Sequence, residues 1–435
     1  MRQFSVQKSS LKGVITAPPS KSHTLRAILF ASLANGKSTI YNYLQSPDTT
    51  AMIESCRLFG ASLNIFPTYL VINGTGGKIE HINLKSVIDA GNSGIVLRFC
   101  ASVGALATTP FIVTGDHSIC HQRRMQPLID GLTQLGALAI SMQGDGFAPL
   151  TIQGPITGGV ACIDGEDSQH VSALLIAAAF ANEPIEIKVN HPGEKPWVAL
   201  TLDWFDRLGI PYENKDFTHY RIKGNSLYNG FEYHVPGDFS SAAFPIAAAI
   251  VTKSNLTIQN LDVSDVQGDK EIIPILQKMG GAIEIDTSTK SVRVFGENPL
   301  VGMPIDINNC IDAITILAVI ACFAKGETLL YNGAVAKHKE CNRIKSIAFE
   351  LSKMGAKIQE TEDGLRIQCS ALYGAKVHSH QDHRMAMSLC VAGLTAEGTT
   401  HISSIECVAK TFATFHEDFK AIGAIIKETA VRDGK

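Results

Sequence analysis

The sequence lacks the cysteine spacing of metal-binding and redox motifs, since no two of its ten cysteines stand three residues apart. Unpaired cysteines scattered along a chain of 435 residues are typical of a reducing compartment, so we expect a cytoplasmic protein. The start, MRQFSVQKSSLKG, has no apolar stretch of the kind that predicts a secretory signal. The longest apolar runs, such as residues 313–324, are too short to span a membrane, and we expect no membrane partner.

An excess of basic residues is also missing. The sequence has 38 lysines and arginines against 41 aspartates and glutamates, which gives a formal net charge of -3. We therefore expect no nucleic-acid partner, and any anion must bind to a local cluster of cations. The composition is 45% hydrophobic and 18% charged, which allows a large core, and the length predicts two or three domains.

What the sequence does contain is a pattern that recurs roughly every 70 residues: an amphipathic stretch, a glycine, and an alternating stretch typical of a strand. In the fifth copy, LSKMGAKIQ, the apolar residues up to the glycine follow helical spacing. Each glycine stands where a helix should end, at a position that favours a left-handed backbone. The six glycines are Gly60, Gly136, Gly209, Gly280, Gly355 and Gly423.

Between these copies lie six stretches that are rich in alanine and apolar on nearly every side. Helices of this kind belong in the interior of a protein. Together the two patterns predict a β-α-β-α-β-β unit that is repeated six times, with three units in each of two α/β domains. The PGD sequence at residues 236–238 is the expected crossing point between the domains. The six stretches are residues 23–34, 93–107, 168–181, 240–251, 311–324 and 383–396.

Polar residues gather at the N-terminal ends of these six predicted helices. Helix N-termini carry unpaired N–H groups and the positive end of the helix dipole, so phosphates and carboxylates bind there. Serine, aspartate and asparagine are also ordinary N-caps, and one such end alone would indicate no more than capping. Six ends with arginines and lysines close by favour an anion-binding site instead. The polar ends are residues 20–26, 91–94, 167–169 and 237–241, Asp312 and residues 381–384.

Three histidines, His378, His380 and His383, stand close together near the last of these helices. Closely spaced histidines can bind zinc, but no matching set of ligands occurs elsewhere in the sequence. We expect no metal site here.

Six motifs occur in the order that is typical of one known family. They are PPSKSHTLRA (18–27), GNSGIVLR (91–98), PGDFSSAAF (236–244), HKECNRI (338–344), QDHRMAM (381–387) and VAKTF (408–412). On these motifs the chain resembles the 5-enolpyruvylshikimate-3-phosphate synthase family over essentially its whole length. The resemblance implies a two-domain inside-out α/β barrel, with domains at 21–237 and at 1–20 with 238–435.

The resemblance also implies an activity. Members of the family transfer the carboxyvinyl group of phosphoenolpyruvate to the 5-hydroxyl of shikimate 3-phosphate and release phosphate, by addition and then elimination. This step belongs to aromatic amino acid biosynthesis and needs no cofactor. We expect a monomer whose partners are these two small-molecule substrates.

The motifs assign residue roles by the same resemblance. Asp312 corresponds to the base for the 5-hydroxyl, Glu340 and Lys410 to the pair that moves the proton of the methylene carbon, and Lys21 to a lysine that contacts both substrates. The other expected substrate-binding residues are Ser22, Arg26, Asn92, Gly94, Arg123, Ser168, Gln169, Lys339, Arg343 and Arg384.

Some positions depart from the family pattern. Asp167 and Glu194 stand where the family has serines that contact the 3-phosphate. We favour the explanation that these side chains turn aside, either to cap the helix at Ser168 or to pair with Lys195. The alternative is that the acceptor carries no phosphate at this position. The loop arginine is either Arg123 or Arg124.

Two other functions stay open. One is the sister enzyme that transfers enolpyruvate to UDP-N-acetylglucosamine. That enzyme has a cysteine five residues before its loop arginine, whereas Cys120 stands three residues before Arg123. The other is a paralogue that binds a small anion without catalysis.

Overall fold

The computed structural model describes residues 2–79 and 86–430. These residues form two compact units. Unit 1 consists of residues 1–18 and 236–435, and unit 2 of residues 19–235. The predicted domain boundaries at 21 and 237 each lie two residues after the limits of unit 2.

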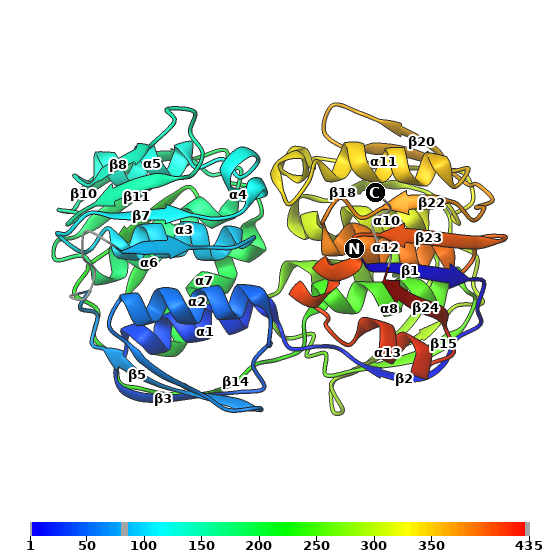
Figure 1. Ribbon diagram of the computed structural model, residues 1–435, viewed down its shortest axis with the longest axis horizontal. Coiled ribbons are helices and arrows are strands. Elements are labelled where there is room, and N and C mark those ends of the chain that lie inside the picture. The colour runs from blue at the N-terminus through cyan, green and yellow to red at the C-terminus, as the bar shows by residue number, and fades with distance from the viewer. Residues whose placement is uncertain (1, 80–85, 431–435) are drawn as a thin grey trace. The chain divides into compact units, whose positions relative to one another are not determined.

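Unit 2 contains three four-stranded sheets in its described part. In Figure 1 the strands β3, β5 and β14 lie along the outer side of helices α1 and α2. In the order of neighbouring strands, the first sheet consists of β14 (Glu232–His234), β3 (Asn35–Tyr41), β5 (Tyr69–Thr75) and β4 (Ser62–Ile65). The second consists of β6 (Val87–Asp89), β7 (Phe111–Thr114), β9 (Leu150–Gln153) and β8 (Leu138–Ser141). The third consists of β10 (Gly159–Asp164), β11 (Ile185–Asn190), β13 (His219–Ile222) and β12 (Tyr212–Lys215). The helices are α1 (Lys21–Leu33), α2 (Pro47–Leu58), α3 (Gly94–Gly104), α4 (His117–His121), α5 (Gln126–Gln134), α6 (Ser168–Phe180) and α7 (Lys195–Leu208).

Unit 1 also has three four-stranded sheets in its described part. In the order of neighbouring strands, the first consists of β2 (Lys12–Thr16), β15 (Asn255–Gln259), β17 (Ser291–Phe295) and β16 (Ala282–Asp286). The second consists of β18 (Pro304–Asp306), β19 (Glu327–Tyr331), β21 (Leu365–Gln368) and β20 (Lys357–Glu360). The third consists of β22 (Lys376–His378), β23 (Thr399–Ser403), β1 (Arg2–Gln7) and β24 (Ile425–Ala430). The helices are α8 (Phe239–Val251), η1 (Gly268–Glu271), α9 (Ile272–Lys278), η2 (Asn308–Ala313), α10 (Ile314–Ala321), η3 (Ala334–His338), α11 (Arg343–Lys353), α12 (His383–Gly393), η4 (Ile405–Lys410) and α13 (Phe415–Ala421).

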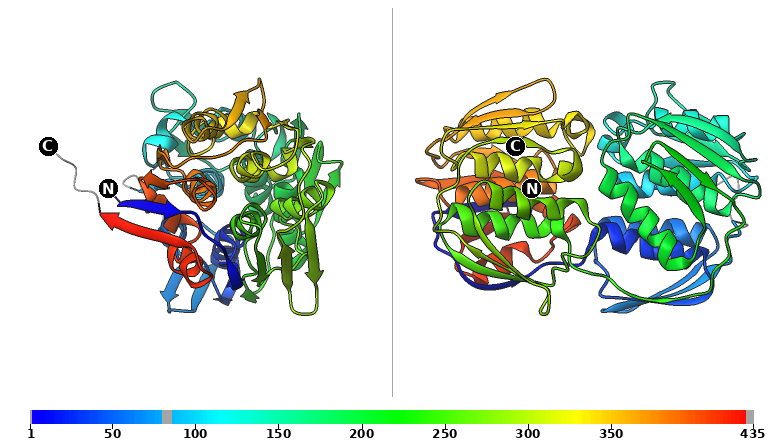
Figure 2. Two further views of the ribbon diagram at one scale, coloured as in Figure 1. Left: turned by 90° about the vertical axis from the view of Figure 1, so that its right-hand side faces the viewer. Right: turned by 180° about the vertical axis from the view of Figure 1, so that it is seen from behind.

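All six sheets have one topology. The first pair of strands is parallel and the other two pairs are antiparallel, as in β6-β7-β9-β8. This is the predicted β-α-β-α-β-β unit. Three sheets are completed by strands that are distant in sequence. β14 joins the first sheet of unit 2, β2 pairs with β15 in unit 1, and β1 lies between β23 and β24 in the last sheet of unit 1. Figure 2 shows the blue N-terminal strand beside the red C-terminal one.

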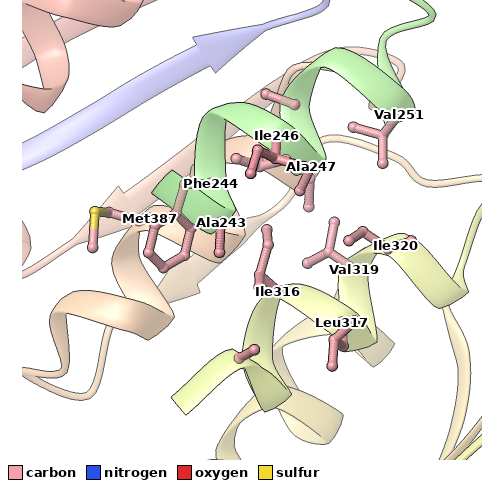
Figure 3. Close-up of a cluster of buried hydrophobic side chains, with 14 of the residues drawn as sticks. Ala243, Phe244, Ile246, Ala247, Val251, Ile316, Leu317, Val319, Ile320 and Met387 are labelled. Carbon is pink, nitrogen blue, oxygen red and sulfur yellow. The ribbon is translucent and has the colours of Figure 1, made fainter. Parts of the chain in front are cut away.

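The alanine-rich helices form the interior of each unit, as predicted. Every residue of α3, α8, α10 and α12 is buried. In unit 1 the helices α8, α10 and α12 pack together through side chains such as Phe244, Ile316 and Met387 (Figure 3). Ala243 and Ala247 lie in the same cluster, and their small side chains let the helices approach closely. The core therefore consists of helices with sheets around them.

The helix-ending glycines are confirmed. Each of the six predicted glycines has a positive φ, from 67° at Gly209 to 105° at Gly60. One helix start differs from the prediction. Residues 311–324 do not form one helix, because η2 precedes α10 and ends at Ala313. No helix in the described part of the chain is long and apolar enough to cross a membrane.

Candidate active site

The polar centre of unit 1 is built around Arg343, at the first position of α11. Asn342 caps this helix by accepting from the backbone N–H of Lys345. The guanidinium of Arg343 is 1% exposed and donates to three carboxylates. Its Nε lies 2.7 Å from Asp382 Oδ2, its Nη1 2.6 Å from Asp312 Oδ1, and its Nη2 2.7 Å from Glu340 Oε2. A buried arginine thereby joins three segments of the chain.

Asp312 lies between two arginines. Its Oδ1 accepts from Arg343, and its Oδ2 accepts from Arg384 Nη2 at 2.7 Å. Burial alone would raise the pKa of this carboxyl group, but Arg384, Arg343 and Lys339 outweigh burial and hold the pKa well below its usual range. Asp312 does not open α10 as we predicted, because it lies inside η2. It is therefore not a helix cap, and its side chain is still 24% exposed.

Glu340 and Lys410 form a second contact in this centre. Lys410 Nζ lies 2.9 Å from Glu340 Oε1, so each oxygen of this carboxylate has a cationic partner. Lys345, which could have formed a simple helical pair with Glu340, is exposed. Lys339 is buried, and its charge reaches Asp312. All six residues that were predicted in this unit are thus gathered into what we call the unit 1 cluster: Asp312, Lys339, Glu340, Arg343, Arg384 and Lys410.

The loop before α12 completes the cluster. Asp382 caps α12 by accepting from the backbone N–H of Arg384, and the same carboxylate binds Arg343. Two of the three neighbouring histidines make side-chain contacts beside this loop: His380 contacts Glu350 at 2.8 Å, and His378 contacts Ser404 at 3.1 Å. Among the described residues no group of His, Cys, Asp and Glu is arranged to hold a metal ion.

In unit 2 the first polar end belongs to α1. Lys21 Nζ lies 3.7 Å from Asp48 Oδ2. Arg26 is buried; it donates to Thr201 Oγ1 and to the carbonyls of Ser22 and Trp197. Burial lowers the pKa of the Arg26 guanidinium to about 9, which leaves it cationic at neutral pH. In the described part of the chain no carboxylate pairs with it.

Arg26 also has an aromatic partner. Its guanidinium carbon lies 5.0 Å from the ring centroid of Phe99, a distance that suits a cation–π contact.

The second polar end belongs to α3. A Cβ atom added at Gly94 would lie 2.8 Å from Arg98 Nη1, 3.1 Å from Arg123 Nη1 and 3.1 Å from Gln169 Oε1. Glycine therefore leaves room where two guanidinium groups converge. Arg123 is 3% exposed, whereas Arg124 is exposed, so Arg123 is the arginine that faces Gly94. Nearby, Asn92 Nδ2 donates to Asp116 and Ser118.

The third polar end belongs to α6. Asp167 caps this helix through the backbone N–H of Gln169 and pairs with Arg98 at 3.0 Å. Glu194 Oε2 accepts from both the backbone N–H and the hydroxyl of Ser168, at 3.0 and 2.9 Å. Both acidic side chains therefore bind the start of α6, as the explanation that we favoured requires. We call this group of residues the unit 2 cluster: Lys21, Ser22, Arg26, Asn92, Gly94, Arg98, Arg123, Asp167, Ser168, Gln169 and Glu194.

Sequence reasoning missed two kinds of residue here. Arg98 was not predicted as a site residue, although it donates to Gln169 Oε1 at 3.0 Å and to the carbonyl of Arg124. Its place in the GNSGIVLR motif was the available signal. Asp382 was also missed as a partner of Arg343, and the QDHR motif was the signal there.

Both clusters place cations and hydrogen-bond donors at the N-termini of buried helices. Such positions bind phosphate and carboxylate groups. The unit 1 cluster adds carboxylates beside these cations, and a carboxylate can take or give a proton. The fold and the two clusters together define an enzyme that acts on phosphate-bearing and carboxylate-bearing small molecules.

Comparison with known proteins agrees with this class. The family model described as EPSP synthase (3-phosphoshikimate 1-carboxyvinyltransferase) matches residues 6–419. The 3-phosphoshikimate 1-carboxyvinyltransferase of Chlamydia pneumoniae is 44% identical over 430 residues, which cover 98% of this chain and 95% of that protein. The enzyme of the same name from Acetivibrio thermocellus is 42% identical over 421 residues, with 97% and 98% covered.

A solved structure is also similar. EPSP synthase from Acinetobacter baumannii matches with a TM-score of 0.82 and 26% identity, over 99% of this chain and 100% of that chain. The chain belongs to the EPSP synthase family, a family of transferases. The family predicted from the six motifs, and its inside-out α/β fold, are confirmed.

Proposed function

We propose that this protein transfers the carboxyvinyl group of phosphoenolpyruvate to the 5-hydroxyl of shikimate 3-phosphate and releases phosphate, as a step of aromatic amino acid biosynthesis. Family membership and the names of the relatives support this reaction over transfer to UDP-N-acetylglucosamine. The observation that carries the proposal is the position of Asp312 between two buried arginines, beside the Glu340–Lys410 pair.

The reaction proceeds in two steps. The 5-hydroxyl oxygen bonds to the central carbon of phosphoenolpyruvate while the methylene carbon takes up a proton and becomes a methyl group. The bond from the central carbon to the phosphate oxygen then breaks, the methyl group returns its proton, and phosphate leaves. No electron is gained or lost overall, so the reaction requires proton transfer and charge stabilisation alone.

We assign the proton transfers to the unit 1 cluster. Asp312 takes the proton of the 5-hydroxyl, and Glu340 with Lys410 handles the proton of the methylene carbon. The low pKa of Asp312 comes from its arginine partners. When an anionic substrate binds those arginines, part of their charge is neutralised, the pKa of Asp312 rises, and it becomes a stronger base.

The remaining residues bind the substrates in this proposal. Arg123, Arg343 and Arg384 bind phosphoenolpyruvate, Arg26 binds the phosphate of the acceptor, and Lys21 contacts both molecules. Arg26 supports the assignment because it is a buried cation whose described partners include no carboxylate, which suits an anionic ligand. The other proposed substrate-binding residues are Ser22, Asn92, Gly94, Ser168, Gln169 and Lys339, of which Ser22 binds the phosphate of the acceptor.

The assay for this function measures phosphate release from phosphoenolpyruvate with one of three acceptors: shikimate 3-phosphate, shikimate or UDP-N-acetylglucosamine. We expect turnover with shikimate 3-phosphate. Release that requires UDP-N-acetylglucosamine would support the sister enzyme, and binding of phosphoenolpyruvate without turnover of any acceptor would support the non-catalytic paralogue.

We further propose that residues 21–237 and residues 1–20 with 238–435 act as two domains of a cytoplasmic monomer. The ten cysteines are all free thiols, which suits a reducing compartment. Sedimentation velocity at micromolar concentration tests the oligomeric state, and a dimer would contradict the proposal.

The acidic residues at α6 lead to a prediction for Asp167. Serine caps a helix about as well as aspartate, and it removes a negative charge from the start of α6. Asp167→Ser should therefore leave the KM for shikimate 3-phosphate unchanged or lower it. Steady-state kinetics with both acceptors measures this, with the exposed Asp164→Ser as the control. A clear preference of the unmodified enzyme for shikimate would show instead that Asp167 selects an acceptor without phosphate.

A further inference from the structure

A carboxyl group without a cationic partner lies beneath the first turn of α8. Asp269, in η1, is 0% exposed. Its Oδ2 accepts from the hydroxyl of Ser240, and its Oδ1 is buried and has no hydrogen-bond partner among the described residues. A buried carboxylate normally has an arginine, a lysine or several N–H donors, because an unpaired charge in the interior is costly. One hydroxyl does not meet that need.

The groups that face Asp269 come from three neighbouring elements. α8 and its N-cap contribute Ser240 and Asp238, η2 contributes Asp312 and the thiol of Cys310, and α12 contributes Arg384. α9 continues η1, and its one ionisable side chain, Lys278, is exposed.

These surroundings favour the protonated form. Burial first, and then the charge of Asp312, raise the pKa of Asp269 to about 7, against the opposing effect of Arg384. Burial raises the pKa of the Cys310 thiol well above its usual value, so that this neighbour stays neutral.

Ser240 links Asp269 to the unit 1 cluster. Its hydroxyl donates to Asp269, while its backbone carbonyl accepts from Arg384 Nη1 at 3.5 Å. Through its Nη2, the same guanidinium binds Asp312. Asp269 is therefore linked to the proposed base by three contacts, through Ser240 and Arg384.

The turn that contains Ser240 is held from the same side by Gln267. The side chain of Gln267 accepts from the backbone N–H of Phe239 at 3.0 Å and donates to the carbonyl of Gly237 at 2.9 Å. The segment from Gln267 to Asp269 thus fixes the start of α8. It thereby also fixes the backbone carbonyl of Ser240, which accepts from Arg384.

We propose that Asp269 is a positioning residue for the Arg384–Asp312 pair: it acts through Ser240, and its charge state sets how strongly Arg384 attracts an anionic substrate. The role rests on the proposed function, in which Arg384 binds phosphoenolpyruvate. Protonated Asp269 leaves the charge of Arg384 available to that substrate. Ionised Asp269 adds a second carboxylate beside Arg384 and weakens the attraction.

The test compares the unmodified enzyme with Asp269→Asn, which keeps the shape of the side chain and can still accept from Ser240 but cannot ionise. The quantity to follow is the KM of the unmodified enzyme for phosphoenolpyruvate divided by the KM of the variant. We expect this ratio to rise about fivefold from pH 6 to pH 8.5, which is the size of a modest charge interaction. The ratio of kcat should stay within about twofold. The ionisation of the substrate cancels, because both enzymes meet the same substrate at each pH.

The matched control is Asp286→Asn, which changes a half-buried aspartate at the end of β16 in the same unit, whose carboxylate accepts from Ser288. Its KM ratio should not change with pH. A KM ratio for Asp269→Asn that is equally flat would overturn the proposal, since a purely structural aspartate would give that result.

A second measurement keeps the proposal testable if Asp269→Asn fails to fold or if the enzyme proves inactive with these substrates. Carbon-13 NMR of the aspartate carboxyl groups, with Ser240→Ala to assign the signal by its shift, follows the ionisation of Asp269 directly. A midpoint between about pH 6 and pH 8 supports the proposal, whereas ionisation complete below about pH 5 overturns it. Failure of the proposed function would leave this midpoint unchanged.

Discussion

Asp312→Asn should lower the turnover number by about a hundredfold or more while both substrates still bind, because asparagine cannot take the proton of the 5-hydroxyl. The binding of phosphoenolpyruvate should be kept or tightened, since Arg343 and Arg384 lose a carboxylate that competes with the substrate. Phosphate-release kinetics and calorimetric titration measure the two effects. Asp306→Asn, an exposed aspartate on β18, is the control and should stay close to the unmodified enzyme.

The same variant has an expected signature in stability. The pKa of Asp312 is depressed in the folded protein, so its ionised form stabilises the fold above the unfolded-state pKa of about 4, and this contribution is lost as the pH falls further. The difference in unfolding free energy between the unmodified protein and Asp312→Asn should therefore shrink below about pH 4. Turnover within about threefold of the unmodified enzyme would rule out Asp312 as the base.

Arg343→Met should have the largest effect on stability. The change leaves three carboxylates, those of Asp312, Glu340 and Asp382, without their shared partner. Loss of one member of a buried ionic network costs about 3–5 kcal/mol, and we expect the unfolding free energy to fall by that amount. Activity should fall at least about a hundredfold, because the variant also loses a proposed ligand of phosphoenolpyruvate.

Urea unfolding at several pH values measures this loss of stability. Carboxylates that lose their cation have their pKa raised by burial, so the folded variant binds protons more readily than its unfolded chain. The variant should therefore recover stability as the pH falls from 7 to 5. Arg366→Met, which removes an exposed ion pair with Glu327, should cost less than about 1 kcal/mol. An Arg343→Met protein as stable as this control would contradict the network.

Much of the fold was readable from the sequence because its signals are local and repeated. A glycine at each helix end, such as Gly209, needs a positive φ whatever surrounds it. The burial of the alanine-rich helices followed from apolar residues on every side. The start of α10 was mispredicted, because the polar residues before Ala313 belong to a separate 3₁₀ turn that hydrophobicity does not mark.

The individual residues of the candidate site were predictable from the sequence, but the contacts between their side chains were not. The motifs supplied Arg343 and Asp312, yet nothing in the sequence states that one guanidinium contacts three carboxylates. The side chain of Glu194 binds Ser168 from a backbone with a φ of 45°, a conformation that no motif encodes. Asp269 gave no signal, since its role depends on burial rather than on a pattern.

The position of the first strand has a consequence for synthesis on the ribosome. Strand β1 pairs with β23 and β24, whose residues emerge from the exit tunnel long after those of β1. The chain of unit 2 is complete once residue 235 has emerged, and such segments fold as they appear. The first strand must instead wait, unpaired and exposed, until nearly the whole chain has been made. Premature termination before Ile425 therefore leaves a nascent protein with one folded unit and an open sheet edge, which is a substrate for chaperones and proteases.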